Sequence, residues 1–313
     1  MAKIIKKVSI YGGGSWGCAL ACQVARVQEK VQIFLRNEKV IEEIKNNHTN
    51  ARYLDDIVLC SNIYPTANLA DIINSELIII AVPSYAFSAA LNNLKLHGLK
   101  STTILLIATK GISKDPIRLL SEELKSILSN PCAFISGPNF AKEVAKGLLT
   151  PVTIAAENFD LANEISHTIK SDNFITSITS DIITVQIAGA IKNIIAIRSG
   201  MYKALGFGEN AKAGLITEGL KDITILSQAM GGRMETLFEV AVLGDLMLTC
   251  YSETSRNTKF GYEFAKSENA AIFLENYPYL IEGRESIKLI LQLSKQYKVE
   301  LHTIAQIAQS LKL

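Results

Sequence analysis

The sequence lacks long hydrophobic runs. No apolar stretch reaches the roughly 20 residues that a membrane-spanning helix needs, and runs such as Leu77–Val82 and Ile104–Ala108 have the length of buried strands. The amino-terminal residues Met1–Lys7 lead directly into an apolar segment, which is not the pattern of a signal peptide. We therefore expect a cytoplasmic protein with no stable membrane insertion.

Cysteine is scarce, and its spacing shows no pairing pattern. The chain has five cysteines, an odd number without the short spacing of metal knuckles: Cys18, Cys22, Cys60, Cys132 and Cys250. Scattered cysteines of this kind are typical of reduced thiols in a cytosolic protein. No group of His, Cys and carboxylate residues has the spacing of metal ligands, so we expect no metal site.

An excess of charge of one sign is absent too. Lys and Arg number 32 against 30 for Asp and Glu, which gives a net charge of +2. A polyanion-binding surface is therefore excluded as the main feature of the molecule, and we expect no nucleic-acid partner. The 313 residues are 48% hydrophobic and 20% charged, which suits a globular protein with two domains.

The most informative pattern that is present is a glycine-rich turn. The apolar residues Val8–Tyr11 are followed by Gly12, Gly14 and Gly17 in G-x-G-x-x-G spacing. In this motif the first glycine allows a tight turn, the second lets backbone N–H groups approach a pyrophosphate, and the third lets the helix pack against the strand. The context predicts a dinucleotide site, with an ordinary glycine-rich turn between strand and helix as the alternative.

The acidic residue that usually follows such a motif by about 20 residues is missing. The next apolar segment, Val31–Leu35, is followed by Arg36, whose guanidinium can pair with the 2′-phosphate of NADPH. An Asp or Glu at this point would instead accept a hydrogen bond from the ribose of NADH. We therefore predict that NADPH is accepted, and a solvated surface arginine is the alternative interpretation of Arg36.

Short apolar segments alternate with helical patterns over the first 180 residues. Near-continuous Ile, Leu and Val runs favour a parallel sheet covered by helices on both faces. From Asp181, a residue type that caps helices, helical periodicity runs to about Gly200, and strand signals become rare. The sequence predicts an α/β Rossmann-like doubly wound domain over residues 1–180, followed by an all-α domain over 181–313. The expected strands are Val8–Tyr11, Val31–Leu35, Leu77–Val82, Thr103–Ala108, Cys132–Ser136 and Val152–Ala156, with Phe174–Thr179 as a further one.

Polar residues follow three of these strands at their carboxyl ends, where open α/β sheets bind ligands. Pro83 and Ser84 follow the third strand, Lys110 the fourth, and Gly137 and Asn139 the fifth. Lys110 is the most informative of them because it comes after a wholly apolar strand. We expect the three loops to line one site.

A lysine is the best candidate for the proton transfer that accompanies hydride transfer. Lys192 lies in an apolar helix, beside a face that carries Gln186, Gly189 and Asn193. Burial should lower its pKa toward neutrality, which suits a general acid–base. Gly189 suggests the close approach of the cofactor domain or the nicotinamide, whereas a snorkelling lysine with a packing glycine is the alternative. None of the histidines lies in a glycine-rich segment or at the end of a strand; they are His48, His97, His167 and His302.

A second polar cluster lies further along the chain. Ser255 and Asn257 flank Arg256 in a loop that leads into a helix. The N–H groups of a helix start, together with an arginine, can hold a phosphate. Asp245 precedes this cluster and can accept hydrogen bonds from substrate hydroxyls or orient Lys192. A Ser/Thr-rich helix cap alone explains the hydroxyls but not the arginine among them.

The order of these motifs resembles that of the bacterial type of NAD(P)-dependent glycerol-3-phosphate dehydrogenase over nearly the whole chain. The resemblance implies reversible reduction of dihydroxyacetone phosphate to sn-glycerol 3-phosphate with NADPH or NADH, which would supply phospholipid synthesis. The stretches that match are Gly12–Gly17, Asn50–Leu54, Ala81–Ser84, Ala108–Gly111, Ser136–Ala141, Gly189–Asn193, Gly208–Ala213, Leu243–Asp245 and Ser255–Asn257.

The resemblance also implies roles for individual residues. Lys192 would be the general acid–base, and Arg256 would reach both substrate and cofactor. The substrate contacts would be Lys110, Gly137, Asn139, Lys192, Asp245, Ser255, Arg256 and Asn257. Together with Gly12, Gly14 and Gly17, the cofactor contacts would be Ser15, Trp16, Arg36, Lys110, Ala141, Arg256, Leu280 and Glu282.

Three positions depart from the family pattern or match it weakly. Asn139 stands where the family usually has Ser or Thr, and its amide can still donate and accept hydrogen bonds, so we expect altered tuning rather than loss of function. The run Met201–Phe207 differs, which leaves the role of that loop open. The match at Leu280 is the weakest of the implied contacts.

Two other functions are compatible with parts of this pattern. Another lysine-dependent dehydrogenase, acting on 6-phosphogluconate or 3-hydroxyisobutyrate, would also carry a lysine on a glycine-marked helix, although Asp245 and the cluster around Arg256 argue against it. A non-catalytic NADPH sensor would bind a partner instead of turning over a substrate. The expected partner is a small triose phosphate, and an apolar helical domain is compatible with a homodimer.

Overall fold

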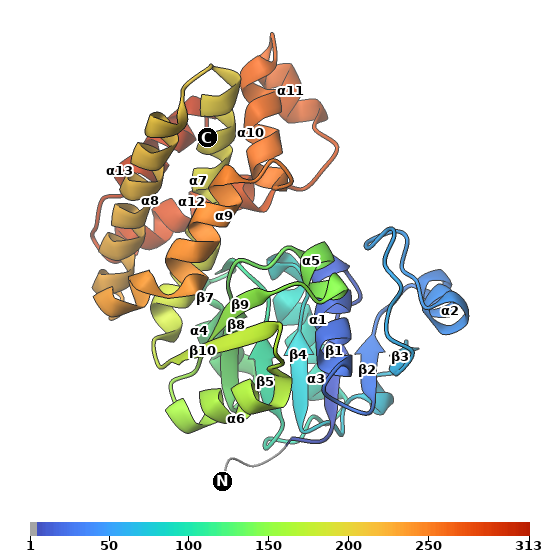
Figure 1. Ribbon diagram of the computed structural model, residues 1–313. Coiled ribbons are helices and arrows are strands. Elements are labelled where there is room, and N and C mark those ends of the chain that lie inside the picture. The colour runs from blue at the N-terminus through green and yellow to red at the C-terminus, as the bar shows by residue number, and fades with distance from the viewer. Residues whose placement is uncertain (1–4) are drawn as a thin grey trace. The chain divides into compact units, whose positions relative to one another are not determined.

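The computed structural model describes residues 5–313, which form two compact units (Figure 1). The first unit contains the residues up to Thr109 together with Leu120–Ile182, and the second contains Lys110–Leu119 together with Ile183–Leu313. The chain therefore passes between the units three times. The division expected at residue 180 lies close to the last of these crossings, whereas no sequence pattern set the segment 110–119 apart.

An eight-stranded sheet forms the centre of the first unit. Its strands follow the order β10-β9-β8-β5-β4-β1-β2-β3, and neighbouring strands are parallel except β8 and β9. Every residue of β4 is fully buried, as expected for a strand covered on both faces. The strands are β1 (Val8–Tyr11), β2 (Val31–Phe34), β3 (Ile63–Thr66), β4 (Leu77–Ile80), β5 (Ile104–Ile107), β8 (Cys132–Ser136), β9 (Thr150–Ala155) and β10 (Phe174–Thr179).

Helices cover both faces of this sheet, as predicted (Figure 1). Helix α1 packs against α5, and α3 packs against α4. The strand order reverses between β1 and β4, so the turns that follow these two strands lie at the switch point where open sheets bind ligands. The helices are α1 (Ser15–Ala25), α2 (Glu38–Asn47), α3 (Phe87–Leu96), α4 (Leu120–Ile127), α5 (Ala141–Lys146) and α6 (Phe159–Ile169), with short 3-10 turns at Leu69–Asp71 and Ser84–Ala86.

Two strands differ from the sequence-based expectation. Strand β3 was not predicted. It contains Pro65 and is an edge strand, where a missing N–H donor is tolerated. Strand β9 begins at Thr150, two residues earlier than expected, and runs antiparallel to β8. The sheet is thus mostly, but not wholly, parallel.

The second unit is helical around a buried central helix. The side chains of Ile187, Ile191 and Ile194 on α7 are fully buried. A two-stranded antiparallel hairpin from the segment 110–119 also belongs to this unit, so the unit is not purely α-helical. Its elements are β6 (Ile112–Lys114), β7 (Ile117–Leu119), α7 (Ile182–Ala204), α8 (Glu209–Ala229), α9 (Asp245–Tyr251), α10 (Arg256–Lys266), α11 (Ala270–Asn276), α12 (Glu282–Gln296) and α13 (His302–Ser310), with a 3-10 turn at Met234–Phe238 and a π-helix at Val240–Gly244.

Helix α7 has the length and composition of a membrane-spanning helix. However, 89% of its apolar 18-residue window is buried by the rest of the chain. A helix that is apolar on all sides and surrounded by protein is what the centre of a helical domain requires. Its composition is therefore weak evidence for a membrane span.

Candidate active site

The glycine-rich turn joins β1 to α1, and its geometry requires two of its glycines. Gly12 has a φ of +123°, and a Cβ there would lie 2.5 Å from the carbonyl oxygen of Ala81. A Cβ on Gly17 would lie only 1.9 Å from the carbonyl oxygen of Gly12. The predicted structural roles, a tight turn at Gly12 and close helix packing at Gly17, are confirmed.

The open side of this turn fits an anionic ligand. Gly14 is the N-cap of α1, no side chain caps the helix, and a Cβ on Gly14 would meet no atom within 4 Å. The first N–H groups of α1 can therefore bind a pyrophosphate. The buried indole Nε1 of Trp16 has no hydrogen-bond partner among residues 5–313, which leaves a donor beside the turn. These residues fit a dinucleotide.

Arg36 lies just beyond β2 and is exposed. Its neighbour Asn37 caps α2 by accepting hydrogen bonds from the N–H groups of Lys39 and Val40. The helix start thus has its own cap, and the guanidinium of Arg36 is accessible to a charged ligand. This placement is compatible with the predicted contact to a 2′-phosphate.

The loop after β8 carries the predicted contacts Gly137, Asn139 and Ala141. Gly137 has a φ of +152°, and a Cβ there would lie 2.9 Å from the carbonyl oxygen of Pro151, so only glycine fits without strain. Asn139 is half-buried, and Ala141 is the first residue of α5. The loop is therefore fixed by its backbone at the carboxyl end of β8.

The second unit contains a buried cluster of two lysines and one aspartate. Lys110 directly precedes the hairpin, Lys192 lies within α7, and Asp245 is the first residue of α9. Lys110 Nζ lies 2.7 Å from Asp245 Oδ2, and Lys192 Nζ lies 2.5 Å from Oδ1. One carboxylate, 1% exposed, therefore holds both ammonium groups. Asp245 therefore contacts Lys192, as one of its two suggested roles requires.

Thr249 completes this cluster and was not among the residues predicted from the sequence. Lys192 Nζ donates a hydrogen bond to Thr249 Oγ1 over 3.0 Å, and that hydroxyl donates to the backbone carbonyl of Asp245 over 2.6 Å. Asp245 and Thr249 are four residues apart on α9, a spacing that places both on one helix face. That spacing was the signal that could have identified Thr249. The π-helix immediately before Asp245 is a feature frequent at functional sites.

The surroundings of Lys192 lower its pKa to about 8. Burial of the ammonium group is the largest cause, and the charge of Lys110 acts in the same direction, while Asp245 opposes both. Burial alone would raise the pKa of Asp245, but the charges of Lys110 and Lys192 outweigh it and hold that pKa below its usual range. The pKa of Lys192 is thus lowered in the direction expected from its apolar helix, and the negative charge of Asp245 limits the shift.

Gly189 faces Lys110 within the second unit. A Cβ on Gly189 would lie 3.6 Å from Cγ of Lys110, an ordinary van der Waals contact. Within the second unit, the neighbour of Gly189 is the aliphatic part of Lys110. The close approach of the cofactor domain or the nicotinamide to this glycine stays a prediction.

The polar cluster around Arg256 forms the start of α10. Ser255 is the N-cap, its hydroxyl accepting from the N–H group of Thr258, and Arg256 is the exposed first residue of the helix. Asn257 is buried, and its Oδ1 accepts a hydrogen bond from the N–H group of Gly283 over 3.0 Å. An exposed guanidinium at a helix start is an arrangement that binds phosphate.

The late stretch around Glu282 packs onto the same helices. Glu282 begins α12, and its carboxylate accepts a hydrogen bond from Asn193 Nδ2 over 3.4 Å. Leu280 is 51% exposed just before it. The structure thus gives Glu282 a contact between α12 and α7, and the cofactor contacts of Leu280 and Glu282 stay predictions.

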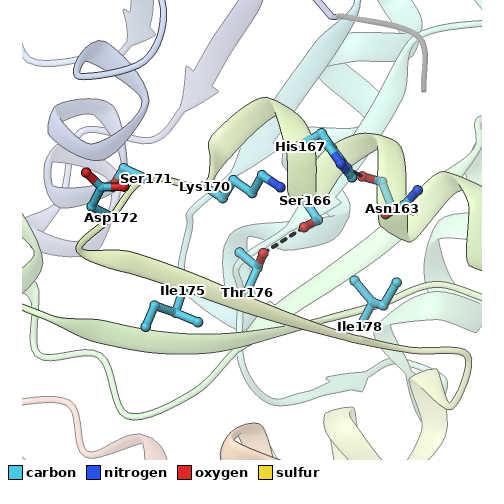
Figure 2. A pocket seen from close by; sticks show the side chains of 9 residues that line it. All are labelled: Asn163, Ser166, His167, Lys170, Ser171, Asp172, Ile175, Thr176 and Ile178. Atoms are coloured by element: carbon cyan, nitrogen blue, oxygen red, sulfur yellow. Dashed lines mark hydrogen bonds between the residues drawn. The ribbon is translucent and has the colours of Figure 1, made fainter. Parts of the chain in front are cut away.

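The first unit also has a groove between α6 and β10, with a volume of about 390 Å³ (Figure 2). The hydroxyls of Ser166 and Thr176 share a hydrogen bond of 2.6 Å across it. His167, the only one of the four histidines in this lining, is exposed and bonds to the carbonyl of Asn163 in its own helix. None of the predicted substrate or cofactor contacts lines this groove.

Comparison with known proteins identifies the family. Models of the N-terminus and the C-terminus of NAD-dependent glycerol-3-phosphate dehydrogenase match residues 7–162 and 181–312. The chain belongs to the NAD-dependent glycerol-3-phosphate dehydrogenase family. The enzyme therefore catalyses the reversible reduction of dihydroxyacetone phosphate to glycerol 3-phosphate with NADH or NADPH, as the resemblance implied.

Relatives of this enzyme match it over nearly their whole length. Glycerol-3-phosphate dehydrogenase (NAD(P)+) of Rickettsia bellii strain OSU 85-389 is 51% identical over 314 residues, covering 99% of this chain and 100% of that protein. The Rickettsia prowazekii strain Madrid E protein of the same name is 48% identical and covers 97% of each chain. The crystal structure of glycerol-3-phosphate dehydrogenase from Coxiella burnetii superposes with a TM-score of 0.89 at 32% identity, covering 97% of this chain and 94% of that one. A non-catalytic sensor is thereby excluded.

Proposed function

We propose that Lys192 is the general acid–base of the reaction and that Asp245, Lys110 and Thr249 hold it in place. The observation that carries this proposal is the single buried carboxylate that binds both lysines at 2.5 and 2.7 Å. Among residues 5–313 the ammonium group of Lys192 donates to two acceptors, Asp245 and Thr249, so the third of its three N–H donors is proposed to bind a substrate oxygen.

Lys192 supplies the proton that the reduction requires. The reduced nicotinamide, when bound, supplies the hydride that reaches the carbonyl carbon of dihydroxyacetone phosphate. Lys192 Nζ donates a hydrogen bond to the carbonyl oxygen, stabilises negative charge as it develops there, and transfers its proton to that oxygen. In the reverse direction, neutral Lys192 accepts the proton from the hydroxyl. Asp245 keeps the amine oriented and stays ionised in both directions.

The substrate phosphate binds, in this proposal, at the start of α10. Arg256 offers charged donors, and the helix start offers N–H groups and a partial positive charge. Ser255 and Asn257 add polar groups from the same turn. Gly137 and Asn139 are further proposed substrate contacts, and the half-buried amide of Asn139 can donate or accept as the family's usual hydroxyl does.

The cofactor binds, in this proposal, to the glycine-rich turn. Gly12 and Gly17 shape the turn, and Gly14 leaves room for the pyrophosphate. Ser15, Trp16 and Ala141 are proposed contacts, and Arg36 is proposed to pair with the 2′-phosphate of NADPH. Lys110 and Arg256 are proposed to contact cofactor as well as substrate, and Leu280 and Glu282 complete the proposed set.

The cellular role follows from the product. Glycerol 3-phosphate is the backbone on which phospholipids are built, so we infer that the enzyme supplies phospholipid synthesis in the cytoplasm. We further propose a homodimer, because exposed apolar residues such as Phe238 and Leu205 remain on the second unit. Light scattering of the purified protein measures that state directly.

Replacement of Lys192 by alanine tests the catalytic assignment. We expect kcat for dihydroxyacetone phosphate reduction to fall by about 100-fold or more, because a positioned acid contributes roughly 10²–10⁴-fold, while the Kd for NADPH changes little. The assay follows the loss of reduced-nicotinamide absorbance on addition of dihydroxyacetone phosphate. A Lys192→Ala variant that keeps near-normal turnover would end the assignment. A panel with 6-phosphogluconate and 3-hydroxyisobutyrate measures the specificity of the site.

A further inference from the structure

Asn50 lies outside the glycine motif but is bonded to it. The residue follows α2 and is fully buried. Its side-chain Nδ2 donates to the carbonyl oxygen of Gly13 over 3.1 Å and to Cys18 Sγ over 3.2 Å. A single amide group therefore contacts the glycine-rich turn and the first turn of α1 together.

A second link joins the same two segments. The backbone carbonyl of Asn50 accepts from the N–H groups of Tyr53 and Leu54, over 3.0 and 2.8 Å, which closes a tight turn. The carbonyl of Tyr53 in turn accepts a hydrogen bond of 2.8 Å from Ser15 Oγ. Two hydrogen bonds thus join the turn 50–54 to the glycine-rich turn, one at Gly13 and one at Ser15.

The bond to Gly13 fixes the direction of the next N–H group. A trans peptide is planar, so the carbonyl of Gly13 and the N–H of Gly14 point in opposite directions. Because the carbonyl is directed at Asn50, the N–H of Gly14 is directed away from it. Gly14 is also the N-cap of α1 and the residue whose Cβ would meet no atom within 4 Å. The orientation of this peptide therefore decides whether the open side presents a donor or an acceptor.

The side-chain oxygen of Asn50 indicates that the amide is oriented to donate to Gly13. Asn50 Oδ1 is buried and has no hydrogen-bond partner in the described part of the chain. A buried acceptor without a partner costs stability because it has lost its hydrogen bonds to water. The opposite amide orientation would place this oxygen against the carbonyl of Gly13, where two acceptors repel. The Asn50 side chain is thus oriented so that its Nδ2 bonds to the Gly13 carbonyl while its Oδ1 makes no hydrogen bond in the described part of the chain.

We propose that Asn50 is a positioning residue for cofactor binding, which holds the Gly13–Gly14 peptide with its N–H toward the pyrophosphate. The inference rests on the proposed cofactor site in the glycine-rich turn. Asn50 itself does not contact the cofactor. Without its amide, the Gly13 carbonyl keeps only a weak contact of 3.6 Å from the thiol of Cys18, so the peptide can rotate and present this carbonyl, which would repel a phosphate.

Replacement of Asn50 by alanine tests this proposal through a split of kinetic constants. We expect the Kd and KM for NADPH to rise about tenfold, as for the loss of one buried hydrogen bond. At saturating NADPH, kcat and the KM for dihydroxyacetone phosphate should stay within about twofold of the wild type. A purely structural role would lower the melting temperature without this selective change.

Asn62, in the turn before β3, provides a matched control because it bonds to the other end of α1. Its Nδ2 donates to the carbonyls of Ala25 and Gln28, over 2.8 and 2.9 Å, at the far end of α1. Asn62→Ala removes an equivalent pair of amide bonds, so it should lower the melting temperature while leaving the Kd for NADPH unchanged. An equal loss of NADPH affinity in both variants would overturn the positioning role.

Asn50→Asp keeps the test decisive where the alanine variant folds poorly. A protonated carboxyl can donate to the Gly13 carbonyl, whereas the ionised form cannot. The Kd for NADPH in this variant should rise with pH relative to that of the wild type measured at the same pH. A pH-independent ratio near one would contradict the proposal.

Gly14→Leu separates failure of this proposal from failure of the cofactor site. A Cβ on Gly14 would meet no protein atom within 4 Å, so the leucine side chain should leave the fold intact and block the space proposed for the pyrophosphate. Loss of NADPH binding in Gly14→Leu with normal binding in Asn50→Ala overturns the positioning role alone. Normal binding in both variants overturns the proposed cofactor site and the positioning role together.

Discussion

At the residue scale, the chemistry depends on how two cations share one anion. Lys110, Lys192 and Asp245 together carry one net positive charge, and the side chains of Lys192 and Asp245 are buried. Burial favours the neutral amine of Lys192, and the carboxylate favours the ammonium form. The balance places the pKa of Lys192 at about 8, so both protonation states are accessible near neutral pH. That is the condition an acid–base group for a reversible reaction needs.

The two directions of the reaction should therefore respond oppositely to pH. Reduction requires protonated Lys192, so its kcat should be constant well below pH 8 and fall tenfold per pH unit well above it. Oxidation requires the neutral amine, so its kcat should rise through the same pH range. Initial rates in both directions between pH 6 and pH 10 measure this, with NADPH or NADP+ saturating. Parallel profiles in the two directions would contradict the assignment to one group.

Asp245→Asn should damage activity and stability together. The change leaves Lys110 and Lys192 buried without their shared anion, which typically costs about 3–5 kcal/mol of unfolding free energy. The neutral amine of Lys192 becomes more favourable, so its pKa falls and the reduction loses its proton donor at neutral pH. Denaturant unfolding and kcat measure the two effects. Glu157→Gln, which breaks the exposed pair with Lys125, is the control and should cost less than about 1 kcal/mol.

At the element scale, the glycine-rich turn shows which parts of a motif the backbone requires. Gly17 on α1 lies against the carbonyl of Gly12, and Gly14 beside it faces open space. Gly17→Ala should therefore destabilise the enzyme by about 1–3 kcal/mol, because the added methyl group forces helix and turn apart. Gly14→Ala, whose φ of −76° suits any residue, should fold with nearly normal stability.

Thermal or denaturant unfolding of the two alanine variants provides the measurement. The comparison is matched because the residues are three positions apart in one motif and receive the same methyl group. Equal stability of both variants would show that the turn relaxes around Gly17 and that the close approach is not a structural requirement.

Elements with strong local patterns were predictable, and those set by distant partners were not. The apolar segment Leu77–Ile80 is fully buried, so its sequence alone indicated a central strand. Strand β3 carries Pro65, and only its position at the sheet edge makes the strand possible. The antiparallel pairing of β9 with β8 depends on the path of the chain between them. Local sequence contains no information about that direction.

The candidate site shows the same limit. The apolar context of Lys192 revealed a buried amine, and the polar residue after a buried strand singled out Lys110. That both lysines bind Asp245 could not be predicted from the sequence. Lys110 belongs to the second unit together with a hairpin that no sequence pattern indicated. Thr249 lies four residues after Asp245 and so shares its face of α9, but that spacing does not show which side chain the face meets. Its role becomes visible only through its bonds to Lys192 and Asp245.

At the scale of the whole molecule, cofactor binding should be measurable as a change in global stability. A ligand that binds only the folded state stabilises it by RT ln(1 + [L]/Kd), which is about 2.7 kcal/mol at 100 times the Kd. If Arg36 pairs with the 2′-phosphate, NADPH should raise the melting temperature more than NADH at the same concentration. The extra charge-assisted hydrogen bonds correspond to roughly 1.5–3 kcal/mol, or about 10- to 100-fold in Kd.

Arg36→Ala should remove this difference between the cofactors and nothing else. The residue is exposed and its neighbour Asn37 supplies the cap of α2, so the variant should unfold like the wild type without ligand. With NADH its melting temperature should rise as in the wild type, whereas with NADPH the rise should fall to the NADH level. Titrations of both proteins with both cofactors, at low and at high salt, give the four curves required. A wild type that prefers NADH, or a variant that keeps its NADPH preference, would place the discrimination at another residue, because only a contact to the 2′-phosphate distinguishes the two molecules.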